Sequence, residues 1–193
     1  MPLSRKLALL GVLSALNCVV RLLGVGFAGI ETAFALIILA GYCLGPRFGF
    51  SLGLISITAS SLISGGIGPW LPFQLIATAC VGFGAGLLPK NLKEKTELLW
   101  LCLYAIVASY AYGAFLTFCT WPLFVGSGTS VSFLAGGSLL ENLVRFVRFE
   151  FFSGGLIWDT GRAVTTVVLI LLIGKALMAT LERATTRANY ELN

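Results

Sequence analysis

The residues of this chain that could take part in chemistry are few, and one short segment gathers several of them. Residues 64–74 read SGGIGPWLPFQ. Glycine permits backbone angles that other residues avoid, and proline lacks the N–H donor that a continuing helix needs. The segment predicts an irregular connection folded over a cavity, where Trp70 and Phe73 offer apolar faces and Gln74 a hydrogen-bond donor and acceptor. A tight turn between two helices, with Trp70 as an interfacial anchor, is the alternative.

Four ionisable residues lie near the ends of apolar segments. Arg21 and Glu31 bracket the glycine-rich stretch RLLGVGFAGIE, and Asp159 and Arg162 are three residues apart, close enough to pair on one helix face. Ionisable residues at such depth usually face a polar interior and mark a ligand or ion path. We expect these four side chains to share one ligand site with the SGGIGPWLPFQ segment. Structural ion pairs near the membrane interface are the alternative.

Several kinds of chemistry are excluded by what the chain does not contain. It has no histidine, which removes histidine-based catalysis, metal ligation and proton relay. It has no G-x-x-x-x-G-K-[ST] phosphate loop and no cysteine spacing that suggests zinc. We therefore predict no enzyme, no catalytic residues, no metal and no cofactor. A mechanism that uses only the carboxylates of Glu31 and Asp159 stays open as an alternative.

The composition indicates the solvent in which these residues lie. Of the 193 residues, 58% are hydrophobic and 11% are charged, whereas a soluble domain carries about 25% charged residues. Residues 48–89 and 98–140 contain no charge at all, and each run is about twice the ~20 residues that one bilayer crossing requires. The sequence predicts an all-α integral membrane protein, with residues 1–193 forming a single membrane domain.

Six membrane-spanning helices account for the alternation of apolar segments and breaks. We expect them at about residues 3–20, 32–44, 48–63, 73–88, 98–118 and 156–177. Pro89 ends the fourth helix and Trp121-Pro122 closes the fifth, because proline cannot continue the hydrogen bonding of a helix. An outward-facing ligand pocket is expected among the outer ends of these helices.

Two connections carry much of the charge. Residues 90–97, KNLKEKTE, are expected to form a cytoplasmic loop, and residues 125–155 an outer loop with an interfacial helix. Within that helix, ENLVRFVRFEFF, the charges at 141, 145 and 148 recur at helical spacing opposite much of the phenylalanine content. The helix either anchors the loop at the membrane interface or covers the mouth of the pocket.

The distribution of basic residues predicts the orientation. With the N-terminus inside, nine of them lie on the cytoplasmic side: Arg5, Lys6, Arg47, Lys90, Lys93, Lys95, Lys175, Arg183 and Arg187. The other four, Arg21, Arg145, Arg148 and Arg162, lie outside, where four carboxylates balance them. A cytoplasmic excess of Lys and Arg is the usual pattern. We expect a multi-pass protein of the bacterial cytoplasmic membrane, surrounded by lipid, with both termini in the cytoplasm and no binding to nucleic acid.

The first helix carries a strip of small residues. Ser4, Ala8, Gly11 and Ala15 follow one another at helical spacing. Small residues on one face allow close helix packing in lipid, where packing drives association. The strip is equally compatible with packing against other helices of the same chain.

Together these features resemble the substrate-binding S components of energy-coupling factor (ECF) vitamin transporters. The chain is similar to the subgroup with a G-P-W-x-P-[FW]-Q loop, here Gly68 to Gln74. The same subgroup has an L-x-G-x-x-x-G-P-R-x-G-F turn, here Leu39 to Phe50. The likeness runs from about residue 8 to residue 174.

The resemblance implies a subunit that captures a vitamin or related small molecule from outside, in a pocket roofed by outer loops. It implies that the small-residue strip docks onto a membrane-embedded T component carrying two ATPase subunits. ATP hydrolysis by these partners would let the subunit reorient and release its ligand inside. A stand-alone secondary carrier or channel is the alternative function.

The chain departs from the family pattern near Asp159. The family tends towards Asp-x-x-His-Ala followed by an asparagine, whereas here Arg162 replaces the histidine and Thr165-Thr166 follow. A permanent cation in place of a neutral imidazole favours an anionic ligand group. Cobalamin, the ligand suggested for some members of the subgroup, therefore fits this sequence poorly.

Overall fold

The computed structural model describes residues 2–24, 31–90, 92–124 and 128–190, which contain helices and no strand. The helices are α1 (Leu3–Gly24), α2 (Ala33–Leu44), α3 (Pro46–Ser64), α4 (Leu71–Ala85), α5 (Glu94–Phe124), α6 (Leu139–Phe152) and α7 (Gly155–Tyr190). Most of the glycine-rich stretch after Arg21 (residues 25–30) lies outside the described residues. So do residue 91 of the predicted cytoplasmic loop and residues 125–127 of the predicted outer loop.

Among these helices, four are long and apolar enough to cross a membrane, namely α1, α3, α5 and α7. The helices α2 and α4 are apolar but shorter, with 12 and 15 residues. At 1.5 Å per residue they span about 18 and 23 Å, less than the ~30 Å hydrocarbon core. The all-α membrane architecture is thus confirmed, whereas six complete crossings stay a prediction.

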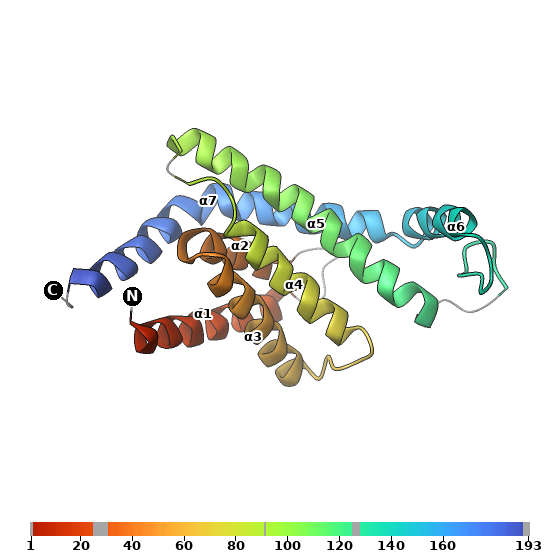
Figure 1. The fold of residues 1–193 in the computed structure, drawn as a ribbon, viewed down its shortest axis with the longest axis horizontal. Helices are drawn as coiled ribbons and strands as arrows, with labels where there is room; N and C mark the ends of the chain where they lie inside the picture. The colour runs from red at the N-terminus through yellow and green to blue at the C-terminus, as the bar shows by residue number, and fades with distance from the viewer. Residues whose placement is uncertain (1, 25–30, 91, 125–127, 191–193) are drawn as a thin grey trace.

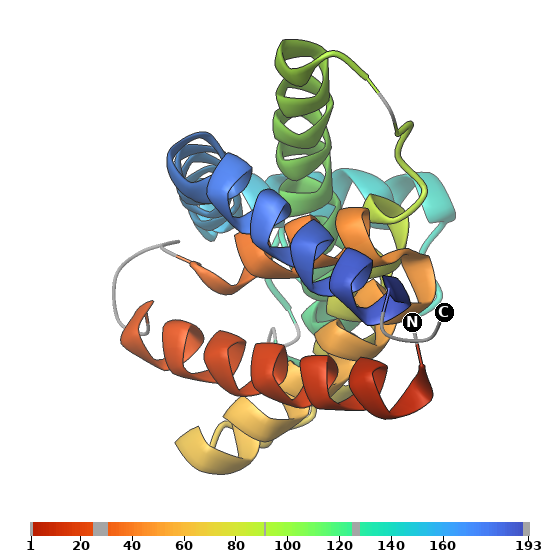
Figure 2. The ribbon, with the colours of Figure 1, turned by 90° about the vertical axis from the view of Figure 1, so that its left-hand side faces the viewer.

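The short helix α2 forms the centre of the bundle. It packs against α1, α3, α4, α5 and α7, and all its residues from Ala33 to Tyr42 are buried. A helix that is apolar on every side is covered either by other protein elements or by lipid, and here other helices surround it. Figure 2 shows α2 between α1 on one side and α5 and α7 on the other.

Glycines bring α2, α3 and α4 together at backbone distance. A Cβ atom added at Gly41 or Gly49 would collide with the backbone carbonyl of Gly82 on α4. Gly45, which separates α2 from α3, has a φ angle of 96°, which residues with a side chain rarely adopt. In the L-x-G-x-x-x-G-P-R-x-G-F turn, Gly41 and Gly49 therefore leave room for the backbone of α4, and Gly45 provides the backbone angle that links α2 to α3.

The bundle has two distinct ends. The first turn of α1, the start of α5 and the last turn of α7 lie at one end, and α6 lies at the other (Figure 1). The turn between α3 and α4 faces away from the termini. The arrangement is compatible with the predicted orientation, in which both termini are inside and α6 is outside. We call these the inner and outer ends below.

Several helix boundaries differ from the sequence-based prediction: α7 continues to Tyr190 instead of ending near residue 177, and both ends of α5 are shifted. Helix α5 begins at Glu94, inside the predicted loop 90–97, and continues past Trp121-Pro122 to Phe124. Pro122 lies in the last turn, where its missing N–H removes only a terminal hydrogen bond. Trp121 is buried and donates its indole N–H to the carbonyl of Val131 at 2.9 Å. It thus joins the end of α5 to the outer loop.

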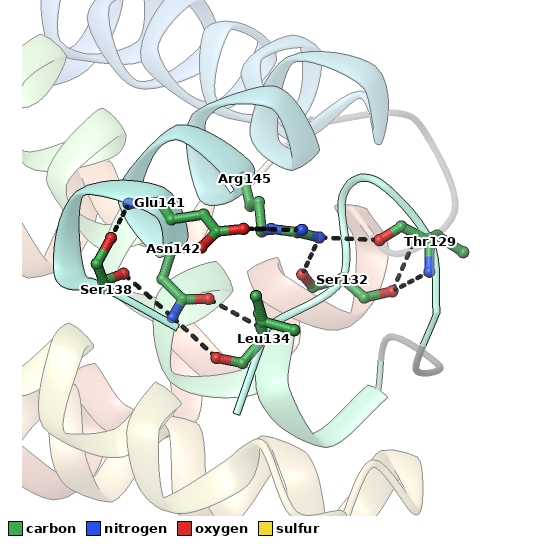
Figure 3. Close-up of polar contacts among 7 residues, drawn as sticks. All are labelled: Thr129, Ser132, Leu134, Ser138, Glu141, Asn142 and Arg145. Atoms are coloured by element: carbon green, nitrogen blue, oxygen red, sulfur yellow. Dashed lines mark hydrogen bonds and ion pairs between the residues drawn. The ribbon is translucent and has the colours of Figure 1, made fainter. Parts of the chain in front are cut away.

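The outer loop is tied to α6 by side-chain hydrogen bonds (Figure 3). Arg145 donates to the carbonyls of Thr129 and Ser132 at 3.1 and 3.5 Å. Asn142 accepts from the backbone N–H of Leu134 at 2.9 Å and donates to its carbonyl at 3.0 Å. The amphipathic helix expected from ENLVRFVRFEFF is therefore present as α6, and it forms one unit with the loop that precedes it.

Candidate functional site

One buried arginine joins three separate parts of the chain. Arg162 on α7 donates from Nε to Oε2 of Glu31 at 2.8 Å and from Nη1 to Oδ1 of Asp159 at 2.6 Å. The same Nη1 donates to the backbone carbonyl of Ser109 on α5 at 3.2 Å. Arg162 is 8% exposed and Asp159 3% exposed. Because Glu31 comes just before α2, the guanidinium connects the entry of α2 with α5 and α7. We call these residues the Arg162 cluster.

Two aromatic rings cover the guanidinium. The ring centroids of Tyr112 and Phe34 lie 4.6 and 5.5 Å from its central carbon, and the two rings meet edge to face at 4.9 Å. A cation over an aromatic face is attracted by the electron-rich face of the neutral ring. Gln74, at the start of α4, lies near the hydroxyl of Tyr112. The two rings therefore bring α2 and α5 into contact with the guanidinium on α7.

Asp159 occupies its place because α5 has a glycine opposite it. A Cβ atom added at Gly113 would collide with the Asp159 carboxylate. Any side chain at this position would therefore push the carboxylate away from Arg162. The ion pair between Asp159 and Arg162 therefore requires a glycine at position 113, although Gly113 itself contributes no polar group.

The cluster carries a surplus of negative charge. The single cation of Arg162 is shared by the two carboxylates of Glu31 and Asp159. Arg21 does not supply the missing charge by direct contact, since its guanidinium donates to Oγ of Ser60 on α3 at 2.7 Å. The sequence predicted that Arg162 favours an anionic ligand group. Because Arg162 already pairs with two carboxylates, that prediction no longer has a basis.

The SGGIGPWLPFQ segment forms a short turn at the outer end. Gly65 ends α3 with a φ of 68°, and the N–H of Leu71 donates to the carbonyl of Gly68 at 2.9 Å. The Trp70 ring lies so close to Gly68 that a Cβ atom there would collide with it. Trp70 remains 39% exposed and Phe73 is half-buried. Residues 65–70 thus form a six-residue connection between α3 and α4, and its role as the cover of a ligand cavity stays a prediction.

An apolar cavity of about 270 Å³ lies between α4 and α5. Tyr112 contributes to its wall, so that the same side chain contacts both the cavity and Arg162. Most of the other lining residues are aliphatic or aromatic, among them Ile76, Val81, Val107 and Phe115. An apolar space beside a compact polar cluster is the usual composition of a small-molecule site.

A model of the family described as "ECF transporter, substrate-specific component" matches residues 5–181. The chain belongs to this family. The match confirms the resemblance and makes the protein a membrane-embedded, substrate-binding subunit of an ECF transporter. Proteins of this kind are transporter subunits rather than enzymes, and they act with a T component and ATPases. No curated protein and no solved structure matches the chain.

In this S component the predicted binding residues fall into two groups. Arg162 contacts both Glu31 and Asp159 directly, and Gln74 lies near Tyr112, whose ring covers the guanidinium. The remaining three are Trp70, which ends the α3–α4 turn, Phe73, in the first turn of α4, and Arg21, on the contact between α1 and α3. Their part in ligand binding stays a prediction.

Sequence reasoning missed the residues that hold the cluster from α5. Ser109, Tyr112 and Gly113 lie within the uncharged run 98–140. A tyrosine in this run indicates a binding site only weakly, because the run contains three tyrosines. The backbone carbonyl of Ser109 and the glycine at 113 give no indication of a site in the sequence. These positions become visible only once α5 packs against α7.

Glu150 on α6 is a second buried carboxylate at the outer end. The residue is 8% exposed, and among the described residues neither carboxylate oxygen has a hydrogen-bond partner. Burial raises the pKa of Glu150 above its usual range, and the negative charge of Asp159 acts in the same direction. The hydroxyl of Thr117 opposes this change in pKa without completing a hydrogen bond. A Cβ atom at Gly155, the first residue of α7, would meet the carboxylate at 2.6 Å.

The Glu150→Gln variant tests this burial. A carboxyl group whose pKa is raised on folding destabilises the folded protein once the pH exceeds that pKa, and the penalty disappears below the ordinary glutamate pKa. We expect the variant to be more stable at pH 8 by on the order of 1 kcal/mol, or about 2–4 °C in Tm. The gain should shrink as the pH falls towards 4. Thermal unfolding in detergent, followed by tryptophan fluorescence across this range, measures it.

The matched control is Glu141→Gln, on the same helix. Glu141 is exposed and pairs with Arg145 at 3.1 Å, so its removal should change stability by at most a few tenths of a kcal/mol. If Glu150→Gln lowered Tm at pH 8, the Glu150 carboxylate would have a stabilising partner and the account of its burial would be wrong.

Proposed function

We propose that this S component captures a vitamin-sized organic molecule outside the bacterial cytoplasmic membrane, at the outer ends of α4, α5 and α7. The observation that supports this site most directly is the Arg162 cluster. Buried ionisable groups are expensive inside a membrane and usually serve a ligand or ion path. Here they adjoin an apolar cavity through Tyr112, so that polar and apolar parts of one ligand can be bound side by side.

The charge of the cluster favours a particular ligand chemistry. Arg162 is already shared by two carboxylates, so an anionic group would have to displace one of them. A cationic or hydrogen-bond-donating group can instead approach Glu31, whose side chain is 18% exposed and the more accessible of the two. The ligand that we propose therefore carries a positive charge or several N–H or O–H donors.

The cavity favours a compact apolar group. Its volume of about 270 Å³ is near the lower limit of small-molecule pockets, which run from roughly 300 to 1,000 Å³. One or two rings fit this space, which is open to the surface at Ile76, Val107 and Phe115. Trp70 and Phe73 offer further apolar surface for stacking at the end of the α3–α4 turn, and Gln74 offers a hydrogen bond.

The strip on α1 is the face that we propose for the partner. Ser4, Ala8, Gly11 and Ala15 are all exposed, and a Cβ atom added at Gly11 would meet nothing within 4 Å. The opposite face of α1 packs against α3 instead. A row of small residues left uncovered by its own chain suits close packing against a second membrane protein. We propose that the T component docks here and that its two ATPase subunits drive release of the ligand into the cytoplasm.

Loss of the Trp70 ring should weaken ligand binding. Stacking of a planar ring on an aromatic side chain contributes about 1–3 kcal/mol in other systems. We therefore expect Trp70→Ala to retain at least about fivefold less of the small molecule that co-purifies with the native protein. Mass spectrometry of extracts from equal amounts of protein measures this. Trp100→Ala is the control, because Trp100 is similarly exposed but lies near the inner end of α5. Equal retention by the Trp70→Ala variant and the native protein would contradict a ligand site at this turn.

Leucine side chains on the strip should block docking. In the double variant Gly11→Leu/Ala15→Leu, the added bulk would separate the two helices, so we expect co-purification with a T component to be lost while the small molecule is still retained. Thr58→Leu on α3 adds similar bulk at another exposed position and should leave the complex intact. Survival of the complex in the double variant would show that α1 is not the docking face.

Ion-driven uptake by liposomes containing this chain alone would contradict the proposed transporter and support a stand-alone carrier.

A further inference from the structure

A second cavity lies at the inner end of the bundle, and none of its lining residues belongs to the Arg162 cluster. It is formed where the first turns of α1, the turn from α2 to α3 and the last turns of α7 meet, and its volume is about 390 Å³. Its lining combines two cations, two hydroxyl groups and an apolar wall: Lys6, Arg47, Ser51, Thr185, Leu7, Leu10, Cys43, Leu44 and Phe48. We call it the inner cavity.

The polar part of the inner cavity is cationic. Lys6 and Arg47 are both exposed, and among the described residues neither forms an ion pair with a carboxylate. No carboxylate is among the residues that line the space. The hydroxyls of Ser51 and Thr185 donate to carbonyls of their own helices. Within the described part of the chain, no carboxylate engages either cation, although Glu182 lies one turn from Thr185 and close enough to Cys43 to act on it electrostatically.

The start of α3 adds backbone donors to these cations. Gly45 provides no side-chain cap, and Pro46 is the first helical residue. The first backbone hydrogen bond of the helix is the one from the N–H of Gly49 to Gly45. The N–H groups of Arg47 and Phe48 consequently have no acceptor within the helix. Such N–H groups, at the positive end of a helix, favour an anion.

The apolar wall of the inner cavity favours an anion that carries apolar chains over a free inorganic anion. Leu7, Leu10, Leu44 and Phe48 line the same cavity as the two cations, so the space is amphipathic. A free phosphate would use the polar part alone. A phospholipid places an anionic headgroup beside apolar chains and would use both parts, and basic pockets between transmembrane helices on the cytoplasmic side bind anionic headgroups in other membrane proteins.

We propose that the inner cavity binds an anionic phospholipid of the cytoplasmic leaflet. Lys6, Arg47 and the first N–H groups of α3 contact the phosphate, and Leu7, Leu10 and Phe48 contact the glycerol and the upper acyl chains. The lipid thereby joins α1 to the α2–α3 turn and to α7 at the end of the bundle opposite the ligand site. Binding at this site does not depend on the identity of the transported molecule.

Lipid-dependent stabilisation of the purified chain tests the proposal. The protein in a neutral detergent is titrated with phosphatidylglycerol, with phosphatidylcholine and with inorganic phosphate, while thermal unfolding and lipid adducts in native mass spectrometry are followed. We expect phosphatidylglycerol alone to raise Tm in a saturable manner and to form a one-to-one adduct. In Lys6→Gln/Arg47→Gln its apparent affinity should fall about tenfold or more, since each basic residue near an anionic surface contributes on the order of 1 kcal/mol.

The control variant is Lys93→Gln/Lys95→Gln, which removes the same charge from exposed positions at the inner end and should retain the affinity of the native protein. An equal loss in this control would mean general charge attraction and would overturn the proposal. So would equal stabilisation by inorganic phosphate, or unchanged phosphatidylglycerol binding in Lys6→Gln/Arg47→Gln. If that double variant does not fold, the single variants Lys6→Gln and Arg47→Gln take its place. Variants that keep lipid binding but lose the T component would assign the cavity to the partner protein instead.

Discussion

A guanidinium shared by two carboxylates inside the bundle is the interaction on which this structure depends most. Arg162 holds Glu31 and Asp159, and removing one member of such a group leaves an uncompensated charge that costs about 3–5 kcal/mol. The entry of α2, the middle of α5 and the start of α7 are therefore constrained to meet at one point. The proposed ligand site, with its surplus negative charge and with Tyr112 beside the apolar cavity, lies at that point.

Packing of the short helices makes the cluster possible. Because Gly41, Gly49 and Gly82 let α2, α3 and α4 approach at backbone distance, α2 can be enclosed on all sides while remaining only 12 residues long. The helix α2 then begins inside the bundle. Glu31, which lies just before it, is therefore close to Arg162 on α7. Close packing at the glycine contacts and ion pairing at the cluster are thus two parts of one arrangement.

Much of this arrangement follows from the sequence, and the remainder depends on tertiary contacts. The apolar runs predicted the helices, ENLVRFVRFEFF predicted α6, and the spacing of Asp159 and Arg162 predicted their pairing. Trp121-Pro122 was expected to end α5, but burial of Trp121 against the outer loop extends the helix by one turn. The contact of Glu31 with Arg162 spans 131 positions, and no local pattern encodes it. The burial of Glu150 was hidden for the same reason, since its position on an amphipathic helix does not reveal what covers it.

A double-mutant cycle on Arg162 and Asp159 tests the central claim most directly. The unfolding free energies of Arg162→Met, Asp159→Asn and the double variant are measured in one detergent, with the native protein as reference. If the two side chains form a buried ion pair, Asp159→Asn is destabilising in the native background but relieves an unpaired charge once Arg162 is gone. The account predicts a coupling of more than about 1 kcal/mol, with the double variant more stable than the sum of the single effects implies. Additivity within about 0.5 kcal/mol would contradict it.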